Sequence, residues 1–273
     1  MENTINVKGR LLSLENPVVM GILNVTPDSF YAPSRIDPAF VAERAKAMLD
    51  AGAAILDVGA CSTRPGAEHA GEAEELERLH KVLEVLDEEL PQAVVSLDTY
   101  RGKVLRECVA NHNVSIINDV SGCDWDDEMF SAVVDARMPY ILTHSASCED
   151  DGPALPQVIK WLARKMWELR QNGVADIIVD PGFGFGKKLE QNYALMAGLE
   201  EFEVLDAPLL VGISRKSMIT RLLALSSADA LPGTMALNMF ALSKGADILR
   251  VHDVPEAVQA VKIWQAVCAN ENS

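Results

Sequence analysis

The sequence predicts a single (β/α)8 TIM barrel, because eight short apolar runs alternate with helix-periodic segments along the whole chain. Strands that alternate with helices pair in parallel through right-handed crossovers, and eight consecutive units favour a closed barrel over an open doubly wound sheet. The length of 273 residues agrees with this fold, since α/β barrels of about 250 residues commonly form one domain. We therefore expect one domain that spans residues 1–273.

The eight predicted strands are each followed by a helical stretch. They are Val18–Asn24, Ile55–Gly59, Val94–Asp98, Ser115–Asp119, Tyr140–His144, Ile177–Asp180, Leu209–Ile213 and Ile248–Val251. Residues 1–17 are expected to form a short β-hairpin that covers the bottom of the barrel. An extra helix is expected at Pro232–Ser243, before the last strand.

The segments between the strands carry the helical pattern. In the first of them Val41, Ala45 and Met48 follow i, i+4, i+7 spacing, which gives one buried face. Three of the predicted helices are followed by a glycine, which adopts the left-handed cap conformation without a Cβ penalty. These glycines are Gly52, Gly173 and Gly245.

Charge and cysteine content exclude several classes of protein. Asp and Glu outnumber Lys and Arg by 40 to 24, giving a formal charge of −16, which argues against nucleic-acid or anionic-membrane binding because either requires a basic surface. We expect no signal peptide and, without an apolar stretch of about 18 residues, no membrane span. Five cysteines without a C-x-x-C pair favour a reducing cytoplasm. The acidic run at 68–89 is expected to be a solvated helix face.

Polar residues lie at or near the carboxyl end of each predicted strand, where the active site of a barrel lies. The set comprises Asn24, Asp57 with the loop Cys61–Gly66, Asp98, Asn118–Asp119, His144, Asp180, Ser214–Ser217, and Arg250 with His252. A buried polar ring is costly unless it binds something. We therefore expect a ligand site at this end of the barrel, although His144 alone fits a packed core position equally well.

Two kinds of chemistry are represented in this ring. Asp98, Asn118 and Asp180 offer acceptors and an amide that suit a fused heterocycle with N–H donors and a carbonyl. Paired carboxylates also occur in glycoside hydrolysis and two-metal sites, but the neighbouring amide and lysine favour recognition of a polar ring. A cationic set suits a phosphorylated or carboxylated substrate; it consists of Arg64, Arg215, Lys216, Arg250 and His252, with the hydroxyls of Ser62 and Thr63.

The glycine-rich segment Pro181–Lys187 follows a strand but matches neither a P-loop nor a dinucleotide-binding fingerprint. We interpret it as a loop whose Phe185 stacks on a flat substrate. Ser214 lacks a nucleophile elbow, which argues against serine nucleophilic chemistry. Ser217 is expected to open a helix whose free N–H groups hold a carboxylate. Arg250 and His252 lie two apart in extended backbone, so both side chains point to one side and form an anion clamp.

Seven segments, in order along the chain, resemble the dihydropteroate synthase family over essentially the whole length. They are Met20–Phe30, Asp57–Gly66, Ser96–Asp98, Ile117–Asp119, Asp180–Lys187, Gly212–Ser217 and Arg250–His252. The resemblance implies condensation of 6-hydroxymethyl-7,8-dihydropterin diphosphate with 4-aminobenzoate and release of pyrophosphate. It also suggests a homodimer and a sulfonamide target, since sulfonamides resemble aminobenzoate and compete with it in this family; the cytoplasmic location is expected from the cysteines.

The resemblance also implies roles for individual residues, of which Asp98, Lys216, Thr63 and Arg64 would be catalytic. The pterin ring would be held by Asp98, Asn118, Asp180 and Lys216. The diphosphate would be bound by Mg²⁺ on Asn24 and by Thr63, Arg64, Arg250 and His252. The aminobenzoate would be bound by Ser217, Phe185, Pro65 and Thr63. The loops Thr26–Ser34 and Cys61–Gly71 would close over the site.

Two segments depart from the family pattern. Tyr31–Ser34 replaces the usual Asp-Gly-Gly, and Thr143–Ser147 stands where Met-His-Met is commoner. Two rival functions are a pterin-dependent corrinoid methyltransferase and a catalytically silent pterin-binding paralogue. The methyltransferase would lack the Ser214–Ser217 segment, and the paralogue would have lost Asn24, Lys216 or Arg250. All of these residues are present.

Overall fold

The computed structural model describes residues 4–25, 38–61, 70–149 and 152–271. Eight parallel strands within these ranges form the predicted barrel, in the order β8-β7-β6-β5-β4-β3-β10-β9. The strands are β3 (Val18–Asn24), β4 (Ile55–Gly59), β5 (Val95–Asp98), β6 (Val114–Asp119), β7 (Tyr140–Thr143), β8 (Ile177–Asp180), β9 (Leu210–Val211) and β10 (Ile248–Val251). A single parallel bridge between Val179 and Leu209 joins β8 to β9, so the ring is nearly closed.

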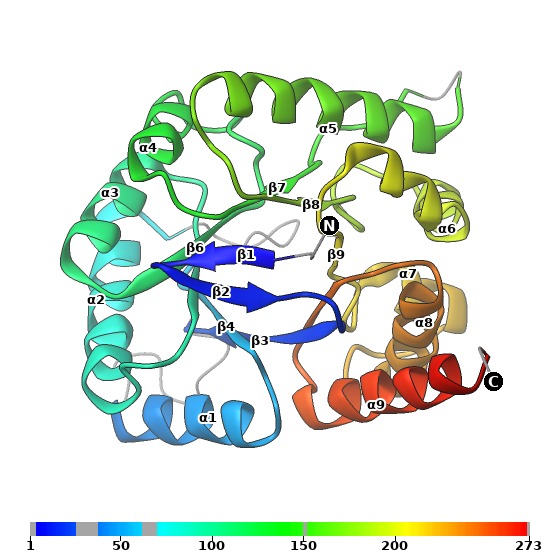
Figure 1. Cartoon of the computed structure of the whole chain (residues 1–273), viewed down its shortest axis with the longest axis horizontal. Helices are drawn as coiled ribbons and strands as arrows, with labels where there is room; N and C mark the ends of the chain where they lie inside the picture. Colours follow the sequence, from blue (N-terminus) through cyan, green and yellow to red (C-terminus); the bar gives the residue numbers. More distant parts are fainter. Residues whose placement is uncertain (1–3, 26–37, 62–69, 150–151, 272–273) are drawn as a thin grey trace.

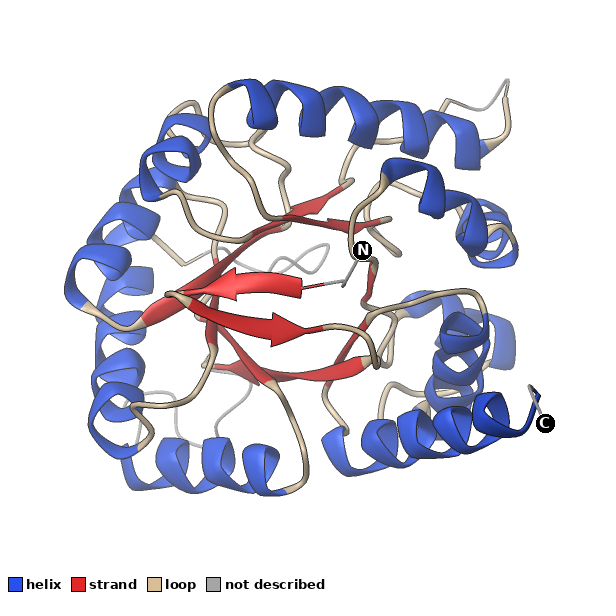
Figure 2. Ribbon diagram, in the orientation of Figure 1, coloured by secondary structure: helices blue, strands red, loops and turns tan. Residues whose placement is uncertain are grey.

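Helices surround the strands on the outside (Figures 1 and 2). They are α1 (Pro38–Asp50), α2 (Glu72–Glu89), α3 (Gly102–Asn111), α4 (Met129–Ala136), α5 (Ala154–Gln171), α6 (Leu189–Ala197), the 3-10 helix η2 (Leu199–Leu205), α7 (Ser217–Leu223), α8 (Leu231–Ser243) and α9 (Val254–Glu271). Helix α8 confirms the extra helix expected before the last strand. In the described part of the chain, no helix combines the length and the apolar composition that crossing a membrane requires.

The three glycines predicted to end helices have the expected left-handed backbone conformation. Gly52, Gly173 and Gly245 have φ of +105°, +91° and +89°, as the predicted caps require.

The main difference from the predicted strands is β9, which is shorter than the predicted strand Leu209–Ile213. It lies at the edge where the ring closes through one bridge, and the chain soon turns through Arg215 at φ +55°.

An antiparallel hairpin of β1 (Thr4–Val7) and β2 (Arg10–Ser13) lies across one end of the barrel (Figure 1). Its Ile5 and Val7, together with Leu14, pack against a layer of apolar side chains that line the inside of the barrel. One residue from each barrel strand or its start contributes to this layer: Met20, Ile55, Val94, Ile116, Ile141, Ile178, Leu210 and Ile248. The hairpin therefore closes the apolar end, as predicted.

The next inward-facing positions carry polar groups. Side chains alternate between the two faces of a strand, so the residue two positions beyond each apolar lumen residue also points inward. At six of the eight strands this residue is polar: Asp57, Ser96, Asn118, Thr143, Asp180 and Arg250. All six are buried or nearly so. The barrel thus has an apolar floor and, directly above it, a polar layer at the carboxyl ends of the strands.

Candidate active site

Arg250 lies at the centre of the polar layer and joins two carboxylates. Its Nε donates to Asp57 Oδ2 and its Nη2 to Asp98 Oδ2, each at 2.5 Å. Asn118 Nδ2 donates to both oxygens of Asp57, at 3.1 Å each. Burial raises the pKa of Asp98 to about 7, an effect that the Arg250 cation opposes and the Asp57 carboxylate increases. Asp57 belongs to the predicted polar ring but has no predicted role. In the structure, the Asp57 carboxylate orients both Arg250 and Asn118.

A second polar group forms around Asp180 and Lys216. Lys216 Nζ donates to the carbonyl oxygen of Phe183 at 2.6 Å and lies 4.8 Å from the centre of the Phe185 ring. Burial lowers the pKa of Lys216 to about 8, although the nearby Asp180 carboxylate opposes the shift. Burial likewise raises the pKa of Asp180, which accepts a hydrogen bond from Gly182 N at 2.7 Å. The structure therefore brings together Asp180 and Lys216, two of the residues expected at the pterin ring, and adds the Phe185 ring, which was expected at the aminobenzoate.

Asn24 reaches the same end of the barrel as Asp98 across Gly59. Asn24, Gly59 and Asp98 are register partners on three neighbouring strands. A Cβ on Gly59 would lie 3.2 Å from Asp98 Cβ and 3.5 Å from Asn24 Oδ1, so glycine lets the two side chains approach each other. An amide oxygen is a suitable ligand for a hard cation. Among the described residues no cluster of three His, Cys, Asp or Glu side chains could hold a metal ion.

The cations after β9 and β10 have different environments. His252 Nδ1 lies 3.0 Å from Ser214 Oγ, which also accepts from His252 N at 3.2 Å. Arg215 instead pairs with Asp253 through two nitrogens, at 2.9 and 2.8 Å, and donates to the carbonyl groups of Ser227 and Ala228. The grouping of Arg215 with the anion-binding cations was therefore wrong, because its guanidinium donates to Asp253, Ser227 and Ala228, which lie outside the polar layer, whereas Arg250 is held within that layer.

The remaining predicted residues either lie outside the described part of the chain or have surroundings of their own. Thr63, Arg64 and Pro65, with Ser62, lie outside the described residues. Ser217 is the exposed first residue of α7. His144 is buried, with its ring 5.0 Å from that of Trp161 in an edge-on arrangement. Burial lowers the pKa of His144 to about 3, so it is a neutral, packed side chain.

Comparison with known proteins decides the family. The family model described as pterin binding enzyme matches residues 20–252. The chain belongs to this family of pterin-binding enzymes. It is 39% identical to the dihydropteroate synthase of Escherichia coli strain K12, over 97% of either chain. These matches confirm the resemblance that the seven segments indicated and favour a synthase over a corrinoid methyltransferase.

Solved structures of pterin-binding enzymes agree with the same assignment. A Xanthomonas albilineans dihydropteroate synthase with 4-aminobenzoic acid superposes with a TM-score of 0.91 at 35% identity, covering 98% of this chain and 99% of that one. A Yersinia pestis dihydropteroate synthase with a sulfonamide drug gives a TM-score of 0.89 at 35% identity, covering 97% and 99%. The barrel fold is confirmed by these likenesses.

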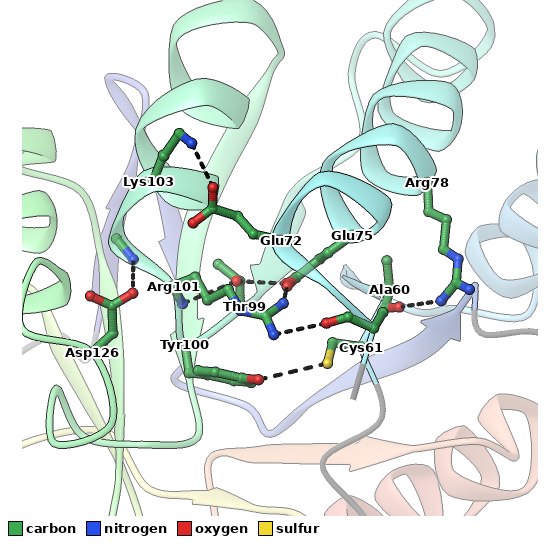
Figure 3. Close-up of polar contacts among 12 residues, drawn as sticks. Ala60, Cys61, Glu72, Glu75, Arg78, Thr99, Tyr100, Arg101, Lys103 and Asp126 are labelled. Carbon is green, nitrogen blue, oxygen red and sulfur yellow. Dashed lines mark hydrogen bonds and ion pairs between the residues drawn. The ribbon is translucent and has the colours of Figure 1, made fainter. Parts of the chain in front are cut away.

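One buried ion pair of this pterin-binding enzyme was missed in the sequence. Glu75, in the acidic run expected to be solvated, is fully buried. It accepts a hydrogen bond from Thr99 Oγ1 at 2.8 Å and pairs with Arg101, whose other nitrogen donates to the carbonyl oxygen of Ala70 at 2.8 Å (Figure 3). The pair links the start of α2 to the chain that follows Asp98, so this part of the acidic run supports the site.

We expect Glu75→Ala to destabilise the protein by about 3 kcal/mol or more, because it leaves the largely buried Arg101 guanidinium without its carboxylate. Chemical denaturation measures the change. Glu77→Ala is the matched control on the same helix, since the Glu77–Lys81 pair is exposed, and it should change stability little. Equal losses from the two variants would contradict the structural role of Glu75.

Proposed function

We propose that this protein is a dihydropteroate synthase that joins 6-hydroxymethyl-7,8-dihydropterin diphosphate to 4-aminobenzoate and releases pyrophosphate. The observation that carries the proposal is the polar layer inside the barrel together with the neighbouring Asp98 and Lys216, which combine acidic, amide and ammonium groups above an apolar floor. Pockets of this composition suit a flat ring with few, fixed polar contacts. The curated relative from Escherichia coli bears the name of this activity.

The hydrogen-bonding groups of the layer complement a reduced pterin. Asn118 Nδ2 donates to both oxygens of Asp57, so the amide oxygen points away from that carboxylate and can accept from a ligand. Asp98 and Asp180 add carboxylate acceptors, and Lys216 supplies a donor. A pterin presents ring N–H and amino donors together with one carbonyl acceptor. We therefore assign the ring to the space between these four side chains.

The diphosphate would lie at the Asn24 and Arg250 side of the site. Mg²⁺ commonly takes one or two protein oxygens and completes its shell with substrate phosphates, and the Asn24 amide oxygen fits that pattern. When bound, Mg²⁺ would neutralise charge on the departing pyrophosphate. Arg250 and His252, with Thr63 and Arg64 from the segment outside the described residues, are proposed to bind the same oxygens.

The reaction needs no nucleophile from the protein. The amine of aminobenzoate forms the C–N bond to the pterin methylene carbon, the C–O bond to the diphosphate breaks, and the amine proton leaves to solvent. As that bond breaks, positive charge develops at the methylene carbon. The Asp98 carboxylate is proposed to offset this charge, as a preorganised electrostatic contribution.

The aminobenzoate is proposed to lie between the Phe185 ring and the start of α7, with its carboxylate at Ser217 and Pro65 and Thr63 as further contacts. Sulfonamides, which resemble aminobenzoate, would compete there.

We further propose a cytoplasmic homodimer. Support for a dimer comes from exposed apolar side chains on and beside the late helices, namely Leu222, Leu223, Leu225, Phe240, Ile263 and Val267; sedimentation equilibrium tests it.

The activity is tested with purified protein, Mg²⁺, the pterin diphosphate and labelled 4-aminobenzoate. We expect labelled dihydropteroate to form and the rate to fall sharply when EDTA removes the metal. Absence of product from protein that still binds pterin would overturn the proposal in favour of a silent pterin-binding paralogue.

A further inference from the structure

We propose that Lys187 is a positioning residue, whose ammonium group holds the loop Pro181–Lys187 against the end of β7 and thereby fixes Phe185 for aminobenzoate. This inference rests on the proposed function. Lys187 Nζ donates to three main-chain carbonyl oxygens: His144 at 2.9 Å, Gly182 at 2.9 Å and Phe185 at 3.0 Å. An ammonium group has three donors, so all of them are used inside the protein.

The loop backbone is shaped around this cation. Gly182, Gly184 and Gly186 all have positive φ, at +69°, +85° and +58°, a region that glycine enters without strain. A Cβ on Gly182 would lie 1.9 Å from the His144 carbonyl oxygen, and one on Gly186 would lie 2.8 Å from that of Ala146. The glycines therefore let the loop lie directly on the end of β7.

This arrangement explains the glycine-rich run that matches no phosphate-binding motif. In a P-loop the lysine reaches the phosphates of a nucleotide. Here the lysine that ends the run binds the carbonyl groups of its own loop. Burial lowers the pKa of Lys187 to about 8, so at neutral pH it remains an ammonium ion with three donors. Lys187 therefore acts on the loop and not on the substrate.

The clamped loop carries groups of the site. Its Phe183 carbonyl accepts the hydrogen bond from Lys216, and its Phe185 ring lies under the same ammonium group. The Lys187 bond to the Phe185 carbonyl holds the backbone from which that ring projects. Asn192 on α6 supports the loop from the other side, accepting from Gly184 N at 2.7 Å. Asp180 instead belongs to a strand whose ladder holds it independently.

The test compares Lys187→Met, which keeps length but removes all donors, with Lys188→Met at the exposed neighbour. At saturating pterin diphosphate, we expect the KM for aminobenzoate to rise at least tenfold in Lys187→Met and less than twofold in Lys188→Met. The Kd for pterin alone, measured by calorimetry, should rise less than the KM for aminobenzoate, because only Lys216 of the proposed pterin-binding residues bonds to the loop. A merely structural lysine would instead reduce the folded fraction and the apparent kcat while leaving KM unchanged.

An unchanged aminobenzoate KM in folded Lys187→Met, beside an active wild type, would overturn the inference. An inactive wild type would instead overturn the proposed function. Should Lys187→Met not fold, Lys187→Arg serves in its place, because a planar guanidinium cannot direct donors at three carbonyl groups around one point. A raised aminobenzoate KM in that variant supports the clamp, and an unchanged one overturns it.

Discussion

Replacement of Arg250 by alanine is expected to raise the Kd for pterin diphosphate at least about 100-fold and the KM for aminobenzoate less than threefold. The guanidinium is the bridge between Asp57 and Asp98, and its loss leaves two largely buried carboxylates facing an anionic substrate. Removing one partner of a buried, hydrogen-bonded charge pair commonly costs about 2–5 kcal/mol, and about 2.7 kcal/mol corresponds to a factor of 100. Calorimetry measures the Kd for pterin diphosphate, and steady-state kinetics measures the KM for aminobenzoate.

Arg250→Lys is the control for this prediction. It keeps the positive charge but cannot bridge the carboxylates through two planar donors, so we expect an intermediate loss of pterin diphosphate affinity. Equal weakening of both substrates by Arg250→Ala would contradict the assignment of this cation to the diphosphate side of the site.

Asp98→Asn is expected to lower kcat/KM by about 10²–10³-fold, the range seen when one preorganised electrostatic group is removed. The amide keeps the shape but loses the negative charge that we propose accepts a pterin N–H and faces the developing cation. Asp57 remains paired with Arg250, so the polar layer keeps one ion pair. Steady-state kinetics on the purified variant measures the loss.

Stability separates a catalytic from a structural role for Asp98. Burial raises the pKa of this carboxyl to about 7, so the folded protein binds its proton more tightly than the unfolded chain does. Ionisation of Asp98 therefore lowers the free energy of unfolding, and this loss grows as the pH rises from about 4 through 7. A neutral asparagine avoids this cost, and we expect little destabilisation at pH 8. A loss of stability as large as the loss of activity would argue for a structural role.

The sequence predicted the barrel because strand and helix patterns are local. It predicted Asp98, Asn118, Asp180 and Arg250 as one set because parallel strands bring their carboxyl ends to one edge. Register and contacts were not predictable in the same way, since they depend on residues far apart in the chain. The bridge from Arg250 to Asp57 spans 193 positions, and no local pattern indicates it.

Two errors have identifiable physical causes. Glu75 was counted with its acidic neighbours, yet it precedes Leu79, Val82 and Leu83 by four, seven and eight positions and so shares their buried face. That signal was present in the sequence. Arg215 was included among the cations because it follows a predicted strand end, but its positive φ turns the chain there and its guanidinium pairs with Asp253.

The most direct test of the proposed site is a crystal structure with a pterin diphosphate analogue, 4-aminobenzoate and Mg²⁺. We predict the pterin ring in hydrogen-bond contact with Asp98, Asn118, Asp180 and Lys216, the diphosphate toward Asn24 and Arg250, and the aminobenzoate beside Phe185. A pterin ring bound away from the polar layer, or within it but without contact to these four side chains, would contradict the account.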